Sequence, residues 1–345
     1  MIAARIPLRN ANRGLSTTKC LLCQWRSFTT TYRRLDDKQP KPAPPRPSVL
    51  DDAPRSYGKK VTEFTPRPLD RAIGLPNPPR PGENTGIDDR TWRERRDDFV
   101  NYDKHLAKRE RLTKAIAKPY YRDWSNLKFS KGKSFLAPPR LFKAERAFYF
   151  PNLFGRTLVK RAKKYADTTP VLMGKISVVS VFSSVWGENQ AATFASAKHN
   201  PELHQVLENN EEKAQLVHIN IEENYLKTLL IKLFIPGLRK RLSEQNWGKY
   251  FMVQKGLNDD LKDAIGLLNN KVGYTYLLDE QCKIRWAGSG EAEDDERNDL
   301  VKGVRRLLAE TKLAQDSIEA ANTQPKSAQN LESPADPRHD IPIKS

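Results

Sequence analysis

The second half of the chain predicts an α/β domain over residues 171–312, and two observations support that prediction. Segments with the alternation or the β-branched content of strands are interleaved with segments of helical periodicity. The last two strand-like segments follow each other as a hairpin, and a helix closes the order β-α-β-α-(β)-α-β-β-α. That order is the thioredoxin-like plan with an insertion. A domain of roughly 140 residues buries about 68–70% of the surface that its unfolded chain exposes, so it needs no cofactor for stability.

The first half of this domain contains two strands and two helices. Ile176–Phe182 is a β-branched run with the length of a buried strand. Asn200-Pro201 supplies an N-cap and a proline at the first position of a helix. Leu216–Ile221 alternates as a half-buried strand does. A helical stretch follows over Tyr225–Leu242, and we expect Pro236-Gly237 to break or kink it.

The second half contains the hairpin. Tyr250–Val253 is a candidate short strand, and Leu257–Leu268 has the pattern of a helix. Tyr274–Leu278 and Ile284–Ala287 are the two hairpin strands, although their connection lacks the usual Asn-Gly or Asp-Gly turn. A final helix opens on the acidic run Glu293–Glu296 and carries its basic residues late, and both placements suit the helix dipole.

The first 34 residues have the composition of a mitochondrial transit peptide. They hold seven basic and no acidic side chains among many Ser and Thr. Arg26-Ser27-Phe28 resembles a site for the matrix processing peptidase. The pair Cys20 and Cys23 has the spacing of a redox or metal half-site, but it lies inside the segment expected to be removed. We therefore expect an imported protein, and we assign no role to this pair.

The net charge of +18 is concentrated in the first half of the chain. Residues 35–170 hold 31 basic and 17 acidic side chains, whereas residues 171–345 hold 22 basic and 25 acidic ones. The predicted folded domain and its tail are therefore slightly acidic. The charge belongs to the leader and to the segments that precede the domain, which weakens a nucleic-acid interpretation based on the total.

Three segments outside the domain are predicted from composition. Residues 35–90 are rich in proline and should form a disordered, extended arm. Residues 91–118 should form a charged helix, because Thr91 and Glu94 have the spacing of a capping box and a proline ends the stretch. Residues 313–345 are polar with scattered prolines and should form a disordered tail.

Residues 119–170 form a lead-in segment in which aromatic side chains alternate with basic ones. Three interpretations are open. The aromatic rings could stack on RNA bases, they could anchor a protein interface, or they could pack on the domain that follows. The basic residues of 119–165 could also contact anionic lipid head groups.

The sequence argues against redox catalysis by the domain. In thioredoxin-like enzymes the working cysteine follows the first strand, at a helix N-terminus that lowers its pKa. The corresponding segment, Phe182–Glu188, contains no cysteine. The turn Val272–Thr275 lacks the proline that redox members place before the penultimate strand. Cys282, the only cysteine beyond the leader, lies in the hairpin connection without a second thiol.

No other catalytic, cofactor or metal site is expected. Gly288-Ser289-Gly290 lacks the Gly-Lys-Ser/Thr end of a phosphate loop. His199 and His204 are five residues apart, which is not the i, i+4 spacing of a helical zinc site. His218 is interpreted as a half-buried strand histidine, and Glu291–Glu296 as a solvated helix start. We predict that the protein is not an enzyme.

Five motifs resemble one family. They are Tyr149–Leu153, Gly155–Leu158, Phe182–Glu188, Gly273–Asp279 and Lys283–Gly288. Together they are similar to the fungal mitochondrial F-type ATP synthase assembly factors, over roughly residues 119–312. The resemblance implies a protein on the matrix side of the inner membrane, held peripherally. It implies a chaperone that binds newly made Fo subunit a (subunit 6) and promotes its incorporation with the c-ring. It does not favour a nucleic-acid partner.

A thioredoxin-like domain without its chemistry is typically a binding platform. As candidate client-binding residues we take Trp186 and Glu188, on the segment where redox members act, and Arg285 and Trp286, on the hairpin. A hairpin tryptophan is more often a core residue, so a buried position is the alternative for Trp286. The alternative function is a mitochondrial ribosome-associated protein that binds RNA through the basic first half. Such binding would depend steeply on salt.

Overall fold

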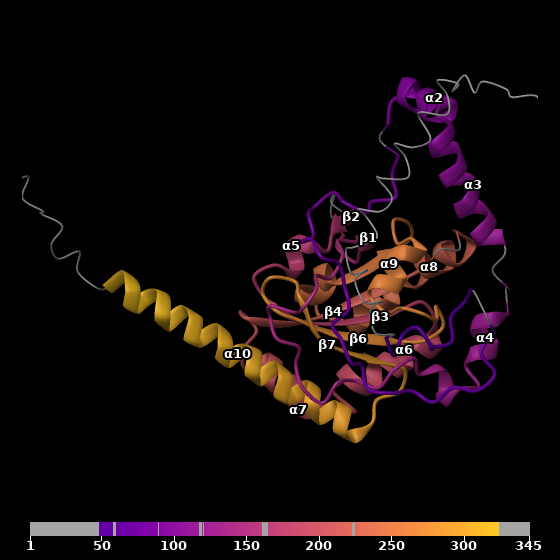
Figure 1. The fold of residues 1–345 in the computed structure, drawn as a ribbon. Coiled ribbons are helices and arrows are strands. Elements are labelled where there is room, and N and C mark those ends of the chain that lie inside the picture. Colours follow the sequence, from indigo (N-terminus) through magenta and orange to yellow (C-terminus); the bar gives the residue numbers. More distant parts are fainter. Residues whose placement is uncertain are drawn as a thin grey trace, which may run out of the picture. The chain divides into compact units, whose positions relative to one another are not determined.

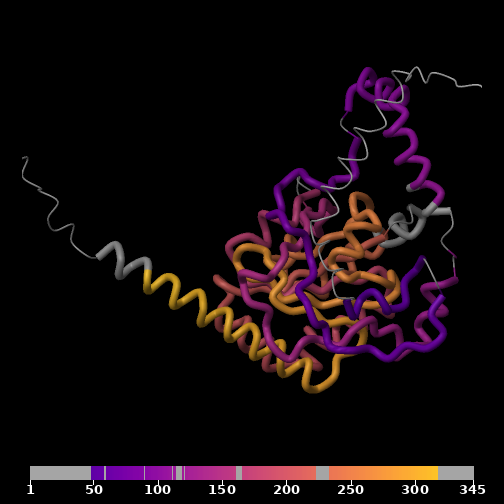
Figure 2. The backbone as a smooth tube through the Cα atoms, in the orientation of Figure 1, coloured from indigo at the N-terminus to yellow at the C-terminus, as the bar shows by residue number. Residues whose placement is uncertain are grey.

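The computed structural model describes residues 48–57, 60–88, 90–116, 119, 121–160, 165–222 and 225–323. The predicted transit segment, residues 1–34, lies outside these described residues, as do Cys20 and Cys23. Figure 1 shows the elements and Figure 2 traces the backbone through them.

A mixed seven-stranded sheet is the centre of the described fold. Its order is β2-β1-β5-β4-β3-β6-β7. The strands are β1 (Phe154–Thr157), β2 (Tyr165–Asp167), β3 (Ile176–Phe182), β4 (Ala214–Ile221), β5 (Tyr250–Val253), β6 (Tyr274–Leu278) and β7 (Ile284–Ser289). Every residue of β3 is buried, as expected for the β-branched central strand.

Helices cover the sheet. The α-helices are α2 (Trp92–Val100), α3 (Tyr102–Ile116), α4 (Arg122–Asn126), α5 (Thr169–Leu172), α6 (Val185–Ala195), α7 (Pro201–Glu208), α8 (Tyr225–Arg241), α9 (Asp259–Ala264) and α10 (Asp294–Thr323). Two 3₁₀-helices are η1 (Ser130–Gly132) and η2 (Glu244–Lys249). Figure 1 shows α7 and α10 side by side under one face of the sheet.

The strand pairing confirms the predicted thioredoxin-like fold class. β3 runs parallel to β4 and antiparallel to β6, with Val179 opposite both Val217 and Tyr276. β6 and β7 form the antiparallel hairpin, and α10 closes the order. The inserted strand β5 is parallel to β4. On its other side β5 pairs with β1, which in turn pairs with β2.

Each face of the sheet has its own apolar core. On one face, β3 side chains such as Val178 pack with Phe194 of α6, Leu203 of α7 and Leu300 of α10. On the other face, side chains such as Val179 pack against α9 and against the chain that precedes the first strand. The second face is therefore covered by a segment that the sequence had placed outside the domain.

The prediction of a disordered arm over residues 35–90 is wrong for the part that the structure describes. Leu50, Leu69 and Ile73 are buried in the core of the second face. Leu69 donates its N–H to the Leu136 carbonyl at 3.0 Å, and Leu75 exchanges backbone hydrogen bonds with Tyr149. Proline-rich chain cannot build a sheet of its own, but its apolar residues can cover an open face.

The lead-in segment of residues 119–170 belongs to the domain as well. It supplies β1 and β2, and Phe135 and Phe150 are fully buried. The Ser289 hydroxyl of β7 accepts the Phe135 N–H at 3.0 Å and donates to the Phe135 carbonyl at 2.7 Å. Phe135 and Phe150 therefore pack on the domain, which is the last of the three interpretations of this segment.

The predicted solvated helix start at Glu291–Glu296 is wrong at its last residue. Glu296 is buried and forms an ion pair with the buried Lys133, at 2.6 Å. Its carboxylate also accepts the Ala137 N–H at 2.8 Å. A buried charge needs such partners, and here the lead-in segment supplies them from far along the chain.

Four helices differ in their bounds from the prediction. α9 covers only Asp259–Ala264 of the predicted Leu257–Leu268. The capping box of Thr91 and Glu94 is present, but the charged helix is divided into α2 and α3 by Asn101, whose side chain accepts N–H groups at the start of α3. α8 continues through Pro236, because Ile235 and its neighbours pack on one core on both sides of the proline. α10 continues to Thr323, eleven residues beyond the predicted end of the domain.

Candidate binding site

The candidate site lies where β3 ends and α6 begins. Ser184 caps α6, since its Oγ accepts the Gly187 N–H at 3.0 Å. The same hydroxyl donates to the Lys271 carbonyl at 2.9 Å, and Ser183 Oγ donates to the Asn270 carbonyl. The two serines therefore hold the first turn of α6 against the loop that precedes β6.

The helix and this loop meet at two glycines. A Cβ on Gly273 would lie 2.1 Å from the Gly187 carbonyl oxygen and 2.8 Å from the Ala191 nitrogen. Gln190 spans the contact: its Oε1 accepts the Gly273 N–H at 3.1 Å and its Nε2 donates to the Lys131 carbonyl at 3.0 Å. Protein atoms therefore fill the space between the helix and the turn at this point.

Exposed apolar side chains surround this junction. Val185 is 73% exposed, Trp186 is 47% exposed, and Trp124 of α4 is 52% exposed. The Lys271 ammonium lies 5.5 Å from the centroid of the Trp124 ring, so the loop contacts α4 as well as α6. We call Trp124, Val185 and Trp186 the tryptophan patch. Glu188, one turn into α6, is half-buried. An exposed tryptophan at the start of a helix is a candidate anchor for a protein partner.

The cysteine of the domain is not placed for redox chemistry. Cys282 is fully buried in the turn between β6 and β7, and its thiol lies 3.7 Å from the Met173 sulfur. Burial raises the pKa of the Cys282 thiol to about 12. A thiol must ionise to act as a nucleophile, so this environment makes Cys282 inert.

The structure places Arg285 and Trp286, both taken as candidate client-binding residues, inside the fold, where both side chains are buried. For Trp286 this is the core position that the sequence also allowed. The Trp286 indole donates to the Pro138 carbonyl at 3.0 Å. Arg285 donates through Nε to the Phe142 carbonyl at 2.7 Å and pairs with Glu310 at 3.1 Å. The lead-in segment and α10 cover the hairpin, which the sequence pattern of the hairpin alone does not reveal.

A polar cavity of about 570 Å³ lies on the same side of the sheet, between α6–α7 and α8–η2. Its floor includes Ser180, His218 and Tyr250, and Ser180 lies opposite His218 in the parallel register. His218 is half-buried, as predicted, and burial lowers its pKa to about 4, so it is neutral at physiological pH. In the sequence, this cavity could have been recognised from the polar residues at inward positions of two neighbouring strands.

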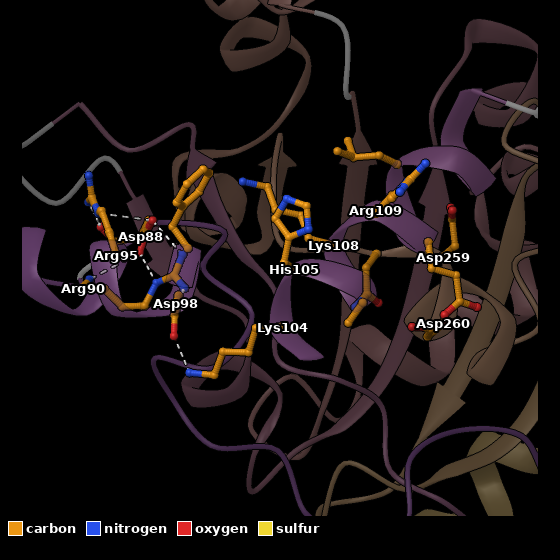
Figure 3. Close-up of a pocket in the computed structure, with 15 residues that line it drawn as sticks. Asp88, Arg90, Arg95, Asp98, Lys104, His105, Lys108, Arg109, Asp259 and Asp260 are labelled. Atoms are coloured by element: carbon orange, nitrogen blue, oxygen red, sulfur yellow. Dashed lines mark hydrogen bonds and ion pairs between the residues drawn. The ribbon is translucent and has the colours of Figure 1, made fainter. Parts of the chain in front are cut away.

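A second hollow, of about 1210 Å³, is lined by charged side chains of residues 88–112 and by the start of α9 (Figure 3). Arg90 pairs with Asp88 at 2.6 Å and also with Asp98, which Lys104 contacts from the other side. The Arg90 hydrogen bond lowers the pKa of Asp88 to about 2. These ion pairs lie within one segment of the chain. The charges of Asp88, Arg90, Asp98 and Lys104 are therefore balanced without a ligand.

Within the part of the chain that the structure describes, no group of three or more His, Cys, Asp or Glu side chains is arranged to hold a metal ion. In the same part, no helix has both the length and the apolar character needed to cross a bilayer.

The fold and the site together define a thioredoxin-like domain. The helix that follows its strand β3, α6, begins without a cysteine and carries exposed apolar residues in its first turn. The family is shown by comparison with known proteins. The family model described as "ATP10 protein" matches residues 55–307, and the chain belongs to this family.

Curated relatives match over most of the chain. "Mitochondrial ATPase complex subunit ATP10" of Eremothecium gossypii is 30% identical over 249 residues, which is 72% of this chain and 88% of the relative. The protein of that name in Candida glabrata is 32% identical over 252 residues, with the same coverage. The one in Saccharomyces cerevisiae is 29% identical over 187 residues, which is 52% of this chain and 66% of the relative.

Solved structures align with about half of the chain. A putative thiol:disulfide interchange protein DsbE from Chlorobium tepidum is 12% identical, with a TM-score of 0.32 over 47% of this chain and 96% of that chain. A DsbF homologue from Corynebacterium diphtheriae is 15% identical, with a TM-score of 0.32 over 48% and 90%. At this level the alignments add nothing to the strand order already described.

Proposed function

We propose that this protein is a non-catalytic assembly factor of the mitochondrial F-type ATP synthase. In this proposal it binds newly made Fo subunit a (subunit 6) as a chaperone and promotes its incorporation with the c-ring. The family and the names of its curated relatives support a role with the mitochondrial ATPase complex. The transit-like leader supports import, and we propose a peripheral position on the matrix side of the inner membrane.

One observation carries the binding part of the proposal: the tryptophan patch stands at the position where redox members of the fold act, without a thiol. Trp186 and Val185 are exposed on the first turn of α6, and the serine caps and the glycine contact hold that turn rigidly. A rigid, exposed aromatic side chain is the usual anchor of a protein interface. Glu188 follows two positions later and lines the cavity between α6–α7 and α8–η2, from which it would contact polar groups of the client.

The test is the recovery of subunit a with the tagged protein from solubilised mitochondria after crosslinking. We expect the double substitution Trp186→Ala with Glu188→Ala to reduce this recovery and the amount of assembled ATP synthase, and to leave the domain folded. Trp92→Ala is the matched control, because Trp92 is 75% exposed on α2, outside the patch. Normal assembly in the Trp186 and Glu188 variant would contradict the proposal.

The ribosome-associated alternative is not favoured by the family match. The same pulldown separates the two functions. Recovery of ribosomal RNA with a steep salt dependence would support the alternative, whereas recovery of subunit a that survives moderate salt supports the assembly factor.

A further inference from the structure

The C-terminal half of α8 presents apolar and basic side chains on one outward face. Leu233 is 71% exposed and Phe234 is 66% exposed. Lys240 and Arg241 follow seven positions later, which returns them to the same face of a helix with 3.6 residues per turn, and both are exposed. Neither forms an ion pair with a residue that the structure describes. We call these four residues the outward face of α8.

The opposite side of α8 holds the helix firmly on the domain. Ile235 is buried, and Leu238 and Leu242 pack against the same apolar cluster. The Trp247 indole N–H lies 3.3 Å from the Arg239 carbonyl and 3.2 Å from the Leu242 carbonyl, so it caps the end of the helix. The outward face is therefore displayed from a fixed element.

The charge of α8 itself is positive, and its Arg241 also borders the cavity that Glu188, Glu208 and Glu211 line. The helix contains no Asp or Glu, and its last turn is Arg239, Lys240 and Arg241. Lys160 adds another ammonium, which lies 5.0 Å from the centroid of the Trp247 ring. The exposed apolar residues of α2 differ in this respect, since Phe99 follows Asp97 and Asp98 directly.

We propose that the outward face of α8 binds the surface of an anionic phospholipid bilayer. Leu233 and Phe234 enter the boundary of the acyl chains, and Lys240 and Arg241 reach the anionic head groups beside them. An anionic surface favours α8 over α2, because α2 carries acidic residues next to its apolar ones.

The inference places the main lipid contact on α8, with Lys160 of residues 119–165 beside it. In that segment Lys133 is buried in an ion pair, and Phe135 and Phe150 lie in the core. The inference deepens the proposed function by naming the element that holds the protein to a membrane. Only the identity of the membrane depends on the proposed function. Binding to vesicles can be measured without subunit a.

The test is flotation of the full chain with vesicles of phosphatidylcholine alone or of phosphatidylcholine mixed with cardiolipin. We expect flotation with the cardiolipin vesicles and much less with phosphatidylcholine alone. Lys240→Gln with Arg241→Gln should lower the partition coefficient roughly thirtyfold, at about fivefold for each basic residue near an anionic surface. Leu233→Ser with Phe234→Ser should lower it by roughly tenfold or more, because two large apolar side chains lose their burial.

Two control pairs match these variants. Phe99→Ser with Val100→Ser removes two apolar side chains of α2 that are 74% and 76% exposed. Lys302→Gln with Arg306→Gln removes two exposed charges from α10. The basic leader is the same in every variant, so it contributes equally to all, and thermal unfolding checks that each variant is folded.

Loss of flotation in both α8 pairs with wild-type flotation in both control pairs supports the inference. Wild-type flotation of either α8 pair, or an equal loss in the control pairs, overturns it. The variant of Trp186 and Glu188 should float as the wild type does. A failure of the membrane inference is therefore distinguishable from a failure of subunit a binding.

Discussion

Gly187 and Gly273 pack backbone against backbone, so close that a Cβ on Gly273 would lie 2.1 Å from the Gly187 carbonyl oxygen. The contact joins the first turn of α6 to the turn that opens β6. The tryptophan patch is therefore displayed beside a closed junction, and it would bind a client on the surface rather than in a groove at this point.

Gly273→Ala should destabilise the domain by about 3 kcal/mol, because the new methyl group can avoid the Gly187 oxygen only by moving the backbone. The matched control is Gly237→Ala in α8, where no atom lies within 4 Å of the new Cβ and where alanine should stabilise the helix by up to about 1 kcal/mol. Urea unfolding measures both. Equal midpoints for the two variants would show that the contact is looser than described.

Trp286→Ala and Trp186→Ala should differ strongly in stability although the two residues look alike in the sequence. Trp286 is fully buried, packs edge-to-face on Phe194 and donates to Pro138, so its loss should cost about 3–5 kcal/mol. Trp186 is 47% exposed, so its loss should cost less than about 1 kcal/mol. Thermal unfolding of both variants is the measurement, and a large loss for Trp186→Ala would place it in the core instead.

The buried pair of Lys133 and Glu296 should show strong coupling. Glu296→Ala should cost about 3 kcal/mol, because the buried Lys133 ammonium then keeps only the Glu291 carbonyl at 2.8 Å and the more exposed Glu293 carboxylate at 3.4 Å. The double variant Lys133→Met with Glu296→Leu should lose less than the sum of the single variants. It should not recover fully, because the Ala137 N–H also loses its acceptor. A double-mutant cycle in urea measures the coupling, and additive losses would argue against a direct pair.

Cys282 should resist alkylation in the native protein. Burial raises its thiol pKa to about 12, so very little thiolate exists at pH 8. Brief treatment with iodoacetamide followed by peptide mass spectrometry should find this residue unmodified, and the same treatment in concentrated urea should modify it. Because the folded pKa is raised, the associated stability is present below the unfolded pKa of about 9 and is lost as the pH rises toward 12. Rapid native labelling would contradict the buried position.

His218 should make the domain less stable in acid. Its folded pKa of about 4 lies below the ordinary value of 6.5, so the unfolded chain takes up the proton first as the pH falls. The stability contributed by neutral His218 is present above about pH 6.5 and is lost down to about pH 4, and the loss is about 3 kcal/mol. His218→Phe should flatten this part of the curve of unfolding free energy against pH. An unchanged slope would assign the acid sensitivity to other groups.

Local sequence patterns predicted most of the secondary structure correctly. The β-branched run of β3, the Asn200 cap with Pro201 at the start of α7, and the hairpin of β6 and β7 each depend on neighbouring residues. The predictions failed where distant chain segments meet. The segment of residues 48–88 was expected to be disordered because its proline content excludes regular structure, but the open face of the sheet gives Leu69 and Ile73 a core to enter.

The candidate site shows the same division. The sequence by itself determined that the turn after β3 contains no cysteine, since this depends only on which residues stand there. The sequence had not predicted α6, and the structure shows that Trp186 lies in its first turn. Only the tertiary structure decided that Trp186 is exposed while Trp286 is buried, that Lys133 meets Glu296, and that α8 turns Leu233 and Phe234 outward. Periodicity states which residues share a face, but what covers that face depends on contacts between segments far apart in the chain.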